Sequence, residues 1–132
     1  MKRKSKWREF ENSEDYELID LGRPAVFLVP IGKLQARVGA LTLEKVLAKF
    51  LSFHFEAFTV RHSSIRGYWK GHTDDLVEYE VSFLGKEKIP LLLKKLAELS
   101  EKINEKCFYI KAGQYTALVQ KPKAIDKSLA FC

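Results

Sequence analysis

Hydrophobic and polar positions divide the chain into a polar N-terminal stretch followed by alternating strand-like and helix-like segments. Residues 25–29 (AVFLV) are continuously apolar and lie between Pro24 and Pro30, which is typical of a short buried strand. From residue 43 to His54, apolar side chains recur every three or four positions, which predicts an amphipathic helix with one face on a sheet. Thr42 stands where its hydroxyl can cap the start of this helix.

The spacing changes to strict alternation after this helix. Residues 58–62 alternate, Ser63 and Ser64 interrupt the pattern, and residues 65–70 resume it, which predicts one strand with a bulge at the serines. After an expected turn over residues 71–75, residues 77–83 alternate between apolar side chains and polar ones. The two segments therefore predict an antiparallel hairpin.

A second helix is predicted from the apolar spacing between Ile89 and Ile103, with Pro90 in its first turn. Residues 107–110 and 115–119 are strand-like and are separated at Gly113. The order is strand, helix, strand, strand, helix, strand, with an extra strand at the end, which is that of the ferredoxin-like βαββαβ unit. The sequence thus predicts an α+β fold in which two helices cover one face of a mostly antiparallel sheet.

We expect one ferredoxin-like domain over residues 23–121, preceded by a basic, partly ordered arm over residues 1–22 and followed by a tail over residues 122–132. A short strand is expected near Leu18 and Leu21 within the arm. No apolar run is long enough for a signal peptide or a membrane span, which predicts a cytoplasmic protein without membrane contact. Cys107 and Cys132 lack CxxC or zinc-ligand spacing and are expected to be thiols in a reducing compartment.

The charge of the chain invites a nucleic-acid interpretation. Its formal net charge is +6, from 23 Lys and Arg against 17 Asp and Glu. Five cations precede the first acid, Glu9, and the remaining residues are nearly neutral. Glu78 and Glu80 also stand where an RNA-recognition sheet of this fold carries exposed aromatic side chains. Residues 2–8 therefore fit either a solubilising chain end or a segment that binds nucleic acid, and the alternative of nucleic-acid binding is restricted to them.

The densest polar and aromatic cluster lies on the predicted hairpin. Cross-strand neighbours lie about 5 Å apart, so an arginine of the first strand is expected to pair with a glutamate of the second. The cluster fits an exposed salt-bridged face, a pocket for a small polar or anionic ligand, or a homo-oligomer interface. Its candidate residues are Arg61, His62, Arg66, Tyr68, Trp69, His72, Glu78 and Glu80.

An enzymatic alternative uses His62 or His72 as the base and Glu78 or Glu80 as the acid. The sequence holds no hydrolase elbow, no Walker loop and no dinucleotide-binding motif. The three histidines lack the spacing of a metal-ligand set. We therefore assign no catalytic residue, cofactor or metal, and we expect a non-enzyme.

From Ala25 to Val119 the chain resembles small ferredoxin-like bacterial proteins of unknown function, through Phe58-Thr59-Val60, Gly67-Tyr68-Trp69 and the acidic strand that follows. The Tyr68-Trp69 pair also resembles the trimeric divalent-cation-tolerance and nitrogen-regulatory signalling proteins. These resemblances imply the fold and a tendency to form oligomers. The leading hypothesis is a small cytoplasmic binding or assembly module, homo-oligomeric, that uses its open sheet face.

Overall fold

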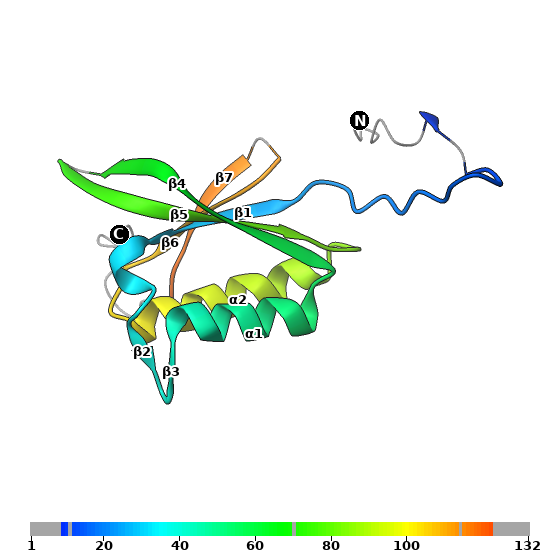
Figure 1. Cartoon of the computed structure of the whole chain (residues 1–132). Coiled ribbons are helices and arrows are strands. Elements are labelled where there is room, and N and C mark those ends of the chain that lie inside the picture. Colours follow the sequence, from blue (N-terminus) through cyan, green and yellow to red (C-terminus); the bar gives the residue numbers. More distant parts are fainter. Residues whose placement is uncertain (1–8, 11, 70, 114, 123–132) are drawn as a thin grey trace.

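Two helices and one antiparallel sheet make up the body of the protein in the computed structural model, which describes residues 9–10, 12–69, 71–113 and 115–122. Helices α1 (Leu43–His54) and α2 (Lys88–Lys102) lie side by side on one face of the sheet (Figure 1). The predicted α+β class, with two helices and a mostly antiparallel sheet, is confirmed. Within the described ranges no helix is long and apolar enough to cross a membrane.

Five strands form the main sheet in the order β4-β5-β1-β6-β7. Their bounds are Ala57–Trp69 for β4, His72–Ser82 for β5, Ala25–Pro30 for β1, Phe108–Ala112 for β6 and Tyr115–Val119 for β7. Every neighbouring pair is antiparallel. The continuously apolar strand β1 lies in the middle, where neighbours on both sides pair its backbone, and β7 is the extra C-terminal strand of the prediction.

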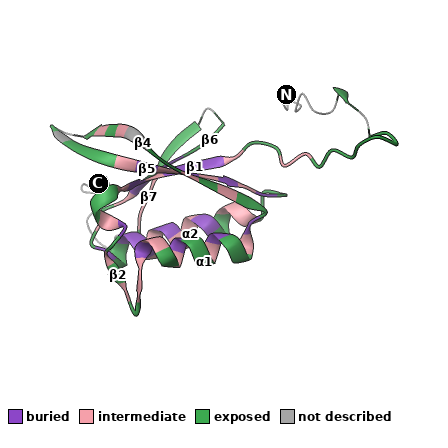
Figure 2. Cartoon of the chain, viewed as in Figure 1, coloured by how far each residue is buried: buried purple, intermediate pink, exposed green. Residues whose placement is uncertain are grey.

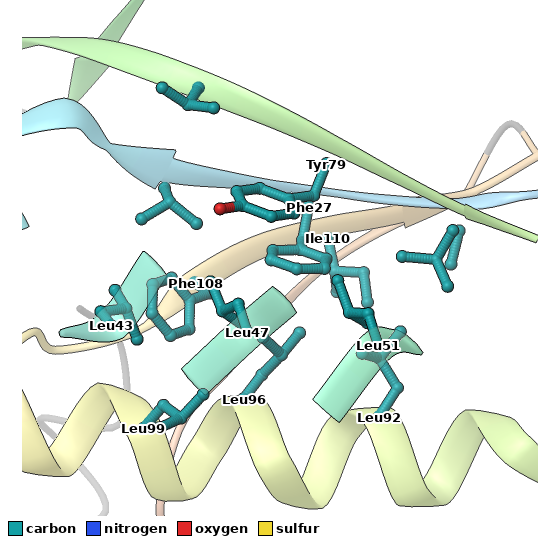
Figure 3. Packing of buried hydrophobic residues seen from close by; sticks show 14 of the residues in the cluster. Phe27, Leu43, Leu47, Leu51, Tyr79, Leu92, Leu96, Leu99, Phe108 and Ile110 are labelled. Carbon is teal, nitrogen blue, oxygen red and sulfur yellow. The ribbon is translucent and has the colours of Figure 1, made fainter. Parts of the chain in front are cut away.

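The hydrophobic core fills the layer between the sheet and the helices (Figure 3). Register places Phe27 opposite Tyr79 of β5 and opposite Ile110 of β6. The rings of Phe27 and Tyr79 stack with their centroids 5.0 Å apart. Leu47 and Leu96 from the two helices are buried against this layer. The apolar residues that recur every three or four positions in the sequence therefore form the helix faces that contact the sheet.

Local sequence signals explain both helix starts. The Thr42 hydroxyl accepts a hydrogen bond from the Lys45 backbone N–H at 3.3 Å, as predicted. Pro90 falls in the first turn of α2, where its missing N–H leaves no intrahelical bond unmade. The segment between β1 and α1 holds a 3₁₀ turn η2 (Ile31–Lys33) and a small hairpin of β2 (Arg37–Val38) and β3 (Leu41–Thr42).

The β4–β5 hairpin extends past the helices at one end of the sheet (Figure 1). Its register shifts between Arg61 and Ile65, which confirms the predicted bulge. The turn expected over residues 71–75 is wrong, because β5 already begins at His72 and pairs with Trp69. Gly71 has a φ of +83°, a left-handed conformation that permits so short a link.

Residues 12–22 form an extended arm that stands away from the body (Figures 1 and 2). No strand occurs in this stretch, so the short strand expected near residues 18–21 is wrong. The hydrogen bonds described here are local, such as Leu18 N–H to the Asn12 Oδ1 at 2.8 Å and Gly22 N–H to the Asp20 Oδ1 at 2.8 Å. Residues 2–8, with the basic cluster, lie outside the described residues.

Candidate functional site

The open face is the sheet surface opposite the two helices. Phe27 and Tyr79 point into the core, so the alternation of a strand places Val26, Glu78 and Glu80 on the open face. Register adds Arg61 of β4, which lies opposite Glu78, and Lys111 of β6, which lies opposite Val26. The open face therefore combines an apolar strand in its centre with charged side chains on both flanks.

An ion-pair cluster occupies the β4 side of this face. Arg61 Nη1 lies 2.5 Å from Glu78 Oε2 and 3.5 Å from Glu80 Oε1, which confirms the predicted cross-strand pairing. The hydrogen bond to Glu78 and the negative charge of Glu80 raise the pKa of the Arg61 guanidinium. One arginine thus offsets part of the charge of two carboxylates, which lowers their repulsion of an anion.

A hollow of about 260 Å³ opens on the same face, next to this ion-pair cluster. Residues 23–24 and the start of β1 form one side of the hollow, β5 forms a second side, and β6 with the turn that follows it forms the third. Its lining residues are Arg23, Pro24, Val26, Glu78, Glu80, Lys111 and Gly113. Only the two glutamates among them were in the sequence-predicted cluster.

Gly113 determines how closely Arg23 approaches the β6–β7 turn. A Cβ atom added at Gly113 would lie 2.6 Å from Arg23 Nη1 and 3.1 Å from Arg23 Cδ. Gly113 also has a φ of +62°, which a residue with a side chain adopts only with strain. The glycine therefore lets the guanidinium lie directly against the turn, at the rim of the hollow.

Arg23 and Lys111 are the cations of the hollow that lack an acidic partner. Neither forms an ion pair with any residue that the structure describes. Val26, which lies between them and the glutamates, is only 8% exposed and forms an apolar floor. The hollow therefore offers two uncompensated positive charges beside a surface that suits a hydrocarbon group.

Two further residues of the predicted cluster, Arg66 and Tyr68, do not join this surface. Arg66 lies opposite Asp75 and is 3.4 Å from it, on the strand positions that alternate with those of the open face. Tyr68 follows the same alternation and is exposed. The eight-residue cluster is therefore divided: Arg61, Glu78 and Glu80 lie together, whereas Arg66 and Tyr68 lie on the other side of the hairpin.

No described side-chain contact joins His62, Trp69 or His72 to the hollow. His62 is exposed next to the bulge and has no hydrogen bond or ion pair within the described part of the chain. Trp69 and His72 are register partners at the end of the hairpin, and their side chains are not among those described. Among described residues, no three His, Cys, Asp or Glu side chains are grouped to hold a metal ion.

Two sequence-based expectations change once the fold is known. Cys107 is partly buried and is not a free thiol, so the expectation of free thiols is wrong at this position. The residues after the basic cluster are also not uniformly neutral, because their charges separate at the start of the domain. Residues 9–22 hold six Asp and Glu and no Lys or Arg, whereas residues 23–132 hold 18 of the 23 Lys and Arg and 11 of the 17 Asp and Glu. The excess of cations therefore belongs to the domain as well as to residues 2–8.

Comparison of the chain with protein-family models, curated proteins and solved structures found no match.

Proposed function

We propose that this protein is a non-enzymatic binding module that holds a small anionic ligand in the hollow of its open face. The observation that carries this proposal is the convergence of Arg23 and Lys111 on the apolar floor, without acidic partners among the described residues. An unpartnered arginine beside an apolar surface favours a carboxylate with a hydrocarbon body, because its planar fork matches the two carboxylate oxygens.

The two glutamates of the hollow limit which anions fit. Arg61 pairs with both of them, so they do not neutralise Arg23 or Lys111. They still exclude a ligand of high negative charge from the β5 side, because like charges repel strongly at short range. A singly charged carboxylate, with its charge toward Arg23 and Lys111, is the ligand that this arrangement favours.

Three further features belong to the same proposal. The strand order β4-β5-β1-β6, with the two helices on one face, supports a ferredoxin-like βαββαβ core to which β7 is added. The open face, which no other layer of the described residues covers, supports a homo-oligomer. A cytoplasmic location stays a prediction, and the bonded state of Cys107 removes the thiol argument for it.

Calorimetric titration with benzoate tests the ligand proposal, with benzamide as the neutral molecule of the same shape. We expect saturable binding of benzoate, none of benzamide, and at least about a tenfold loss of affinity in Arg23→Met/Lys111→Met, because charged hydrogen bonds contribute about 1.5–3 kcal/mol each. Lys94→Met is the control, because Lys94 is an exposed lysine on α2. Equal affinity of the double variant and the wild type would show that these cations hold no ligand.

The enzymatic and nucleic-acid alternatives have no structural observation in their favour. The described histidine of the predicted pair, His62, contacts neither glutamate of the hollow. The basic residues 2–8 lie outside the described part of the chain, and an acidic stretch separates them from the domain.

A further inference from the structure

The arm exposes apolar side chains that an isolated domain would bury. Tyr16 is 46%, Leu18 37% and Ile19 67% exposed, although the three lie within four positions of each other. The described hydrogen bonds of residues 12–22 stay within the arm. An extended segment with clustered apolar side chains and only local described hydrogen bonds has the properties of a strand that pairs elsewhere.

The two outer edges of the sheet differ in how well they resist such pairing. β4 is interrupted by its bulge and carries Arg61 and Arg66, features that typically prevent edge-to-edge association. β7 pairs with β6 in unbroken register, and its residues Tyr115–Val119 (YTALV) include no charge and no proline. Within the described part of the chain, no strand pairs with the outer edge of β7.

Charge favours contact between the arm and the β7 edge. Residues 9–22 hold six acids and no base, whereas residues 115–121 hold Lys121 and no acid. The lengths agree to within one residue, since residues 16–21 are six positions and β7 has five. From Ala25 back to residue 16 the extended chain reaches about 30 Å, enough to cross to a neighbouring molecule.

We propose that residues 16–21 of one copy of this chain add as an antiparallel or parallel strand to the outer edge of β7 of a second copy. Exchange in both directions closes a twofold dimer in which each sheet gains a sixth strand. The contact covers Leu18 and Ile19 and fills the unprotected edge. It rests on the self-association in the proposed function but not on the ligand hollow, so either can fail without the other.

Sedimentation velocity of the full chain across micromolar concentrations tests the arm. We expect a dimer for the wild type and a monomer for Leu18→Asp/Ile19→Asp, whose substitutions lie outside the folded core. Phe53→Asp is the matched control, because Phe53 is 83% exposed on α1 and far from both the arm and β7 in sequence. A wild-type monomer, or a dimer that the double variant retains, would overturn the proposal.

A charge change on β7 identifies the edge. Thr116 is exposed on β7. We expect Thr116→Glu to weaken the dimer several-fold by repelling the acidic arm, and Thr116→Lys to keep it or strengthen it. In wild type, backbone amides on the outer side of β7 should exchange slowly, and in the arm variant they should exchange fast. Equal effects of the two Thr116 variants, or fast exchange at β7 in a wild-type dimer, would place the contact elsewhere.

Discussion

Removal of the Tyr79 hydroxyl tests the central packing of the fold through its pH dependence. Tyr79 is 2% exposed, and its ring stacks on Phe27. Burial, with a smaller contribution from the negative charge of Glu44, raises the pKa of the Tyr79 phenol to about 12 from 10.0. The neutral phenol is thus favoured in the folded state, and Tyr79→Phe keeps the stacked ring while removing the titrating group.

The raised pKa fixes the sign of the effect. Stability linked to the neutral phenol is fully present below the unfolded pKa near pH 10 and is lost as the pH rises through the folded pKa. A pKa shift of this size lowers the free energy of unfolding by about 1.4 kcal/mol at pH 11 and by about 3 kcal/mol well above pH 12. Tyr79→Phe is expected to avoid this loss, whereas other groups that titrate at high pH affect both proteins alike.

Urea unfolding followed by far-ultraviolet circular dichroism at pH 8 and pH 11 measures the difference. Between pH 8 and pH 11, the free energy of unfolding of the wild type should fall by about 1.4 kcal/mol more than that of Tyr79→Phe. Tyr109→Phe is the control, because Tyr109 lies opposite Leu28 on the open face and is 38% exposed. An equal loss in the wild type and in Tyr79→Phe would show that Tyr79 is not buried as described.

Three further substitutions test the packing, the helix start and a partly buried charge. Leu96→Ala should lower the free energy of unfolding by about 2–5 kcal/mol, because Leu96 is 0% exposed; a loss under 1 kcal/mol in urea unfolding would contradict the core. Thr42→Ala should cost about 1 kcal/mol by removing the cap of α1, whereas Thr42→Ser should restore it. Burial raises the pKa of the Glu105 carboxyl; the positive charge of Lys33 opposes this shift and the negative charge of Asp74 adds to it. Glu105→Gln should therefore raise the urea midpoint at pH 7, and the two proteins should become alike below the pKa of the carboxyl. A lower midpoint of Glu105→Gln at pH 7 would refute this prediction.

Local patterns in the sequence were sufficient to predict both helices and the five strands of the main sheet. The apolar spacing from Leu43 to His54 predicted the bounds of α1. It did so because the apolar residues that recur every three or four positions form the helix face that contacts the sheet. The two serines after His62 predicted the bulge, because they interrupt an alternation that resumes after them. The early start of β5 was missed, because polar residues that follow Gly71 can form either a turn or an exposed strand.

The site depends on contacts that no local pattern encodes. Lys111 reaches the hollow because β1 pairs with β6, which places Lys111 opposite Val26 from a distant part of the chain. Arg23 reaches it because Gly113 has no side chain to block its approach. The predicted cluster also grouped residues that the fold separates. Arg61 and Arg66 are near in sequence, but the alternation of the strand places them on opposite sides of the hairpin.

The central claim is that Arg23 and Lys111 hold a small carboxylate on the open face. An NMR titration of the labelled protein with benzoate locates the ligand residue by residue. We predict saturable shifts of the amides around Val26, Lys111 and Gly113, with no comparable shifts in α1 or α2, and none on addition of benzamide. Shifts confined to the helices, or the same shifts in Arg23→Met/Lys111→Met, would contradict the account.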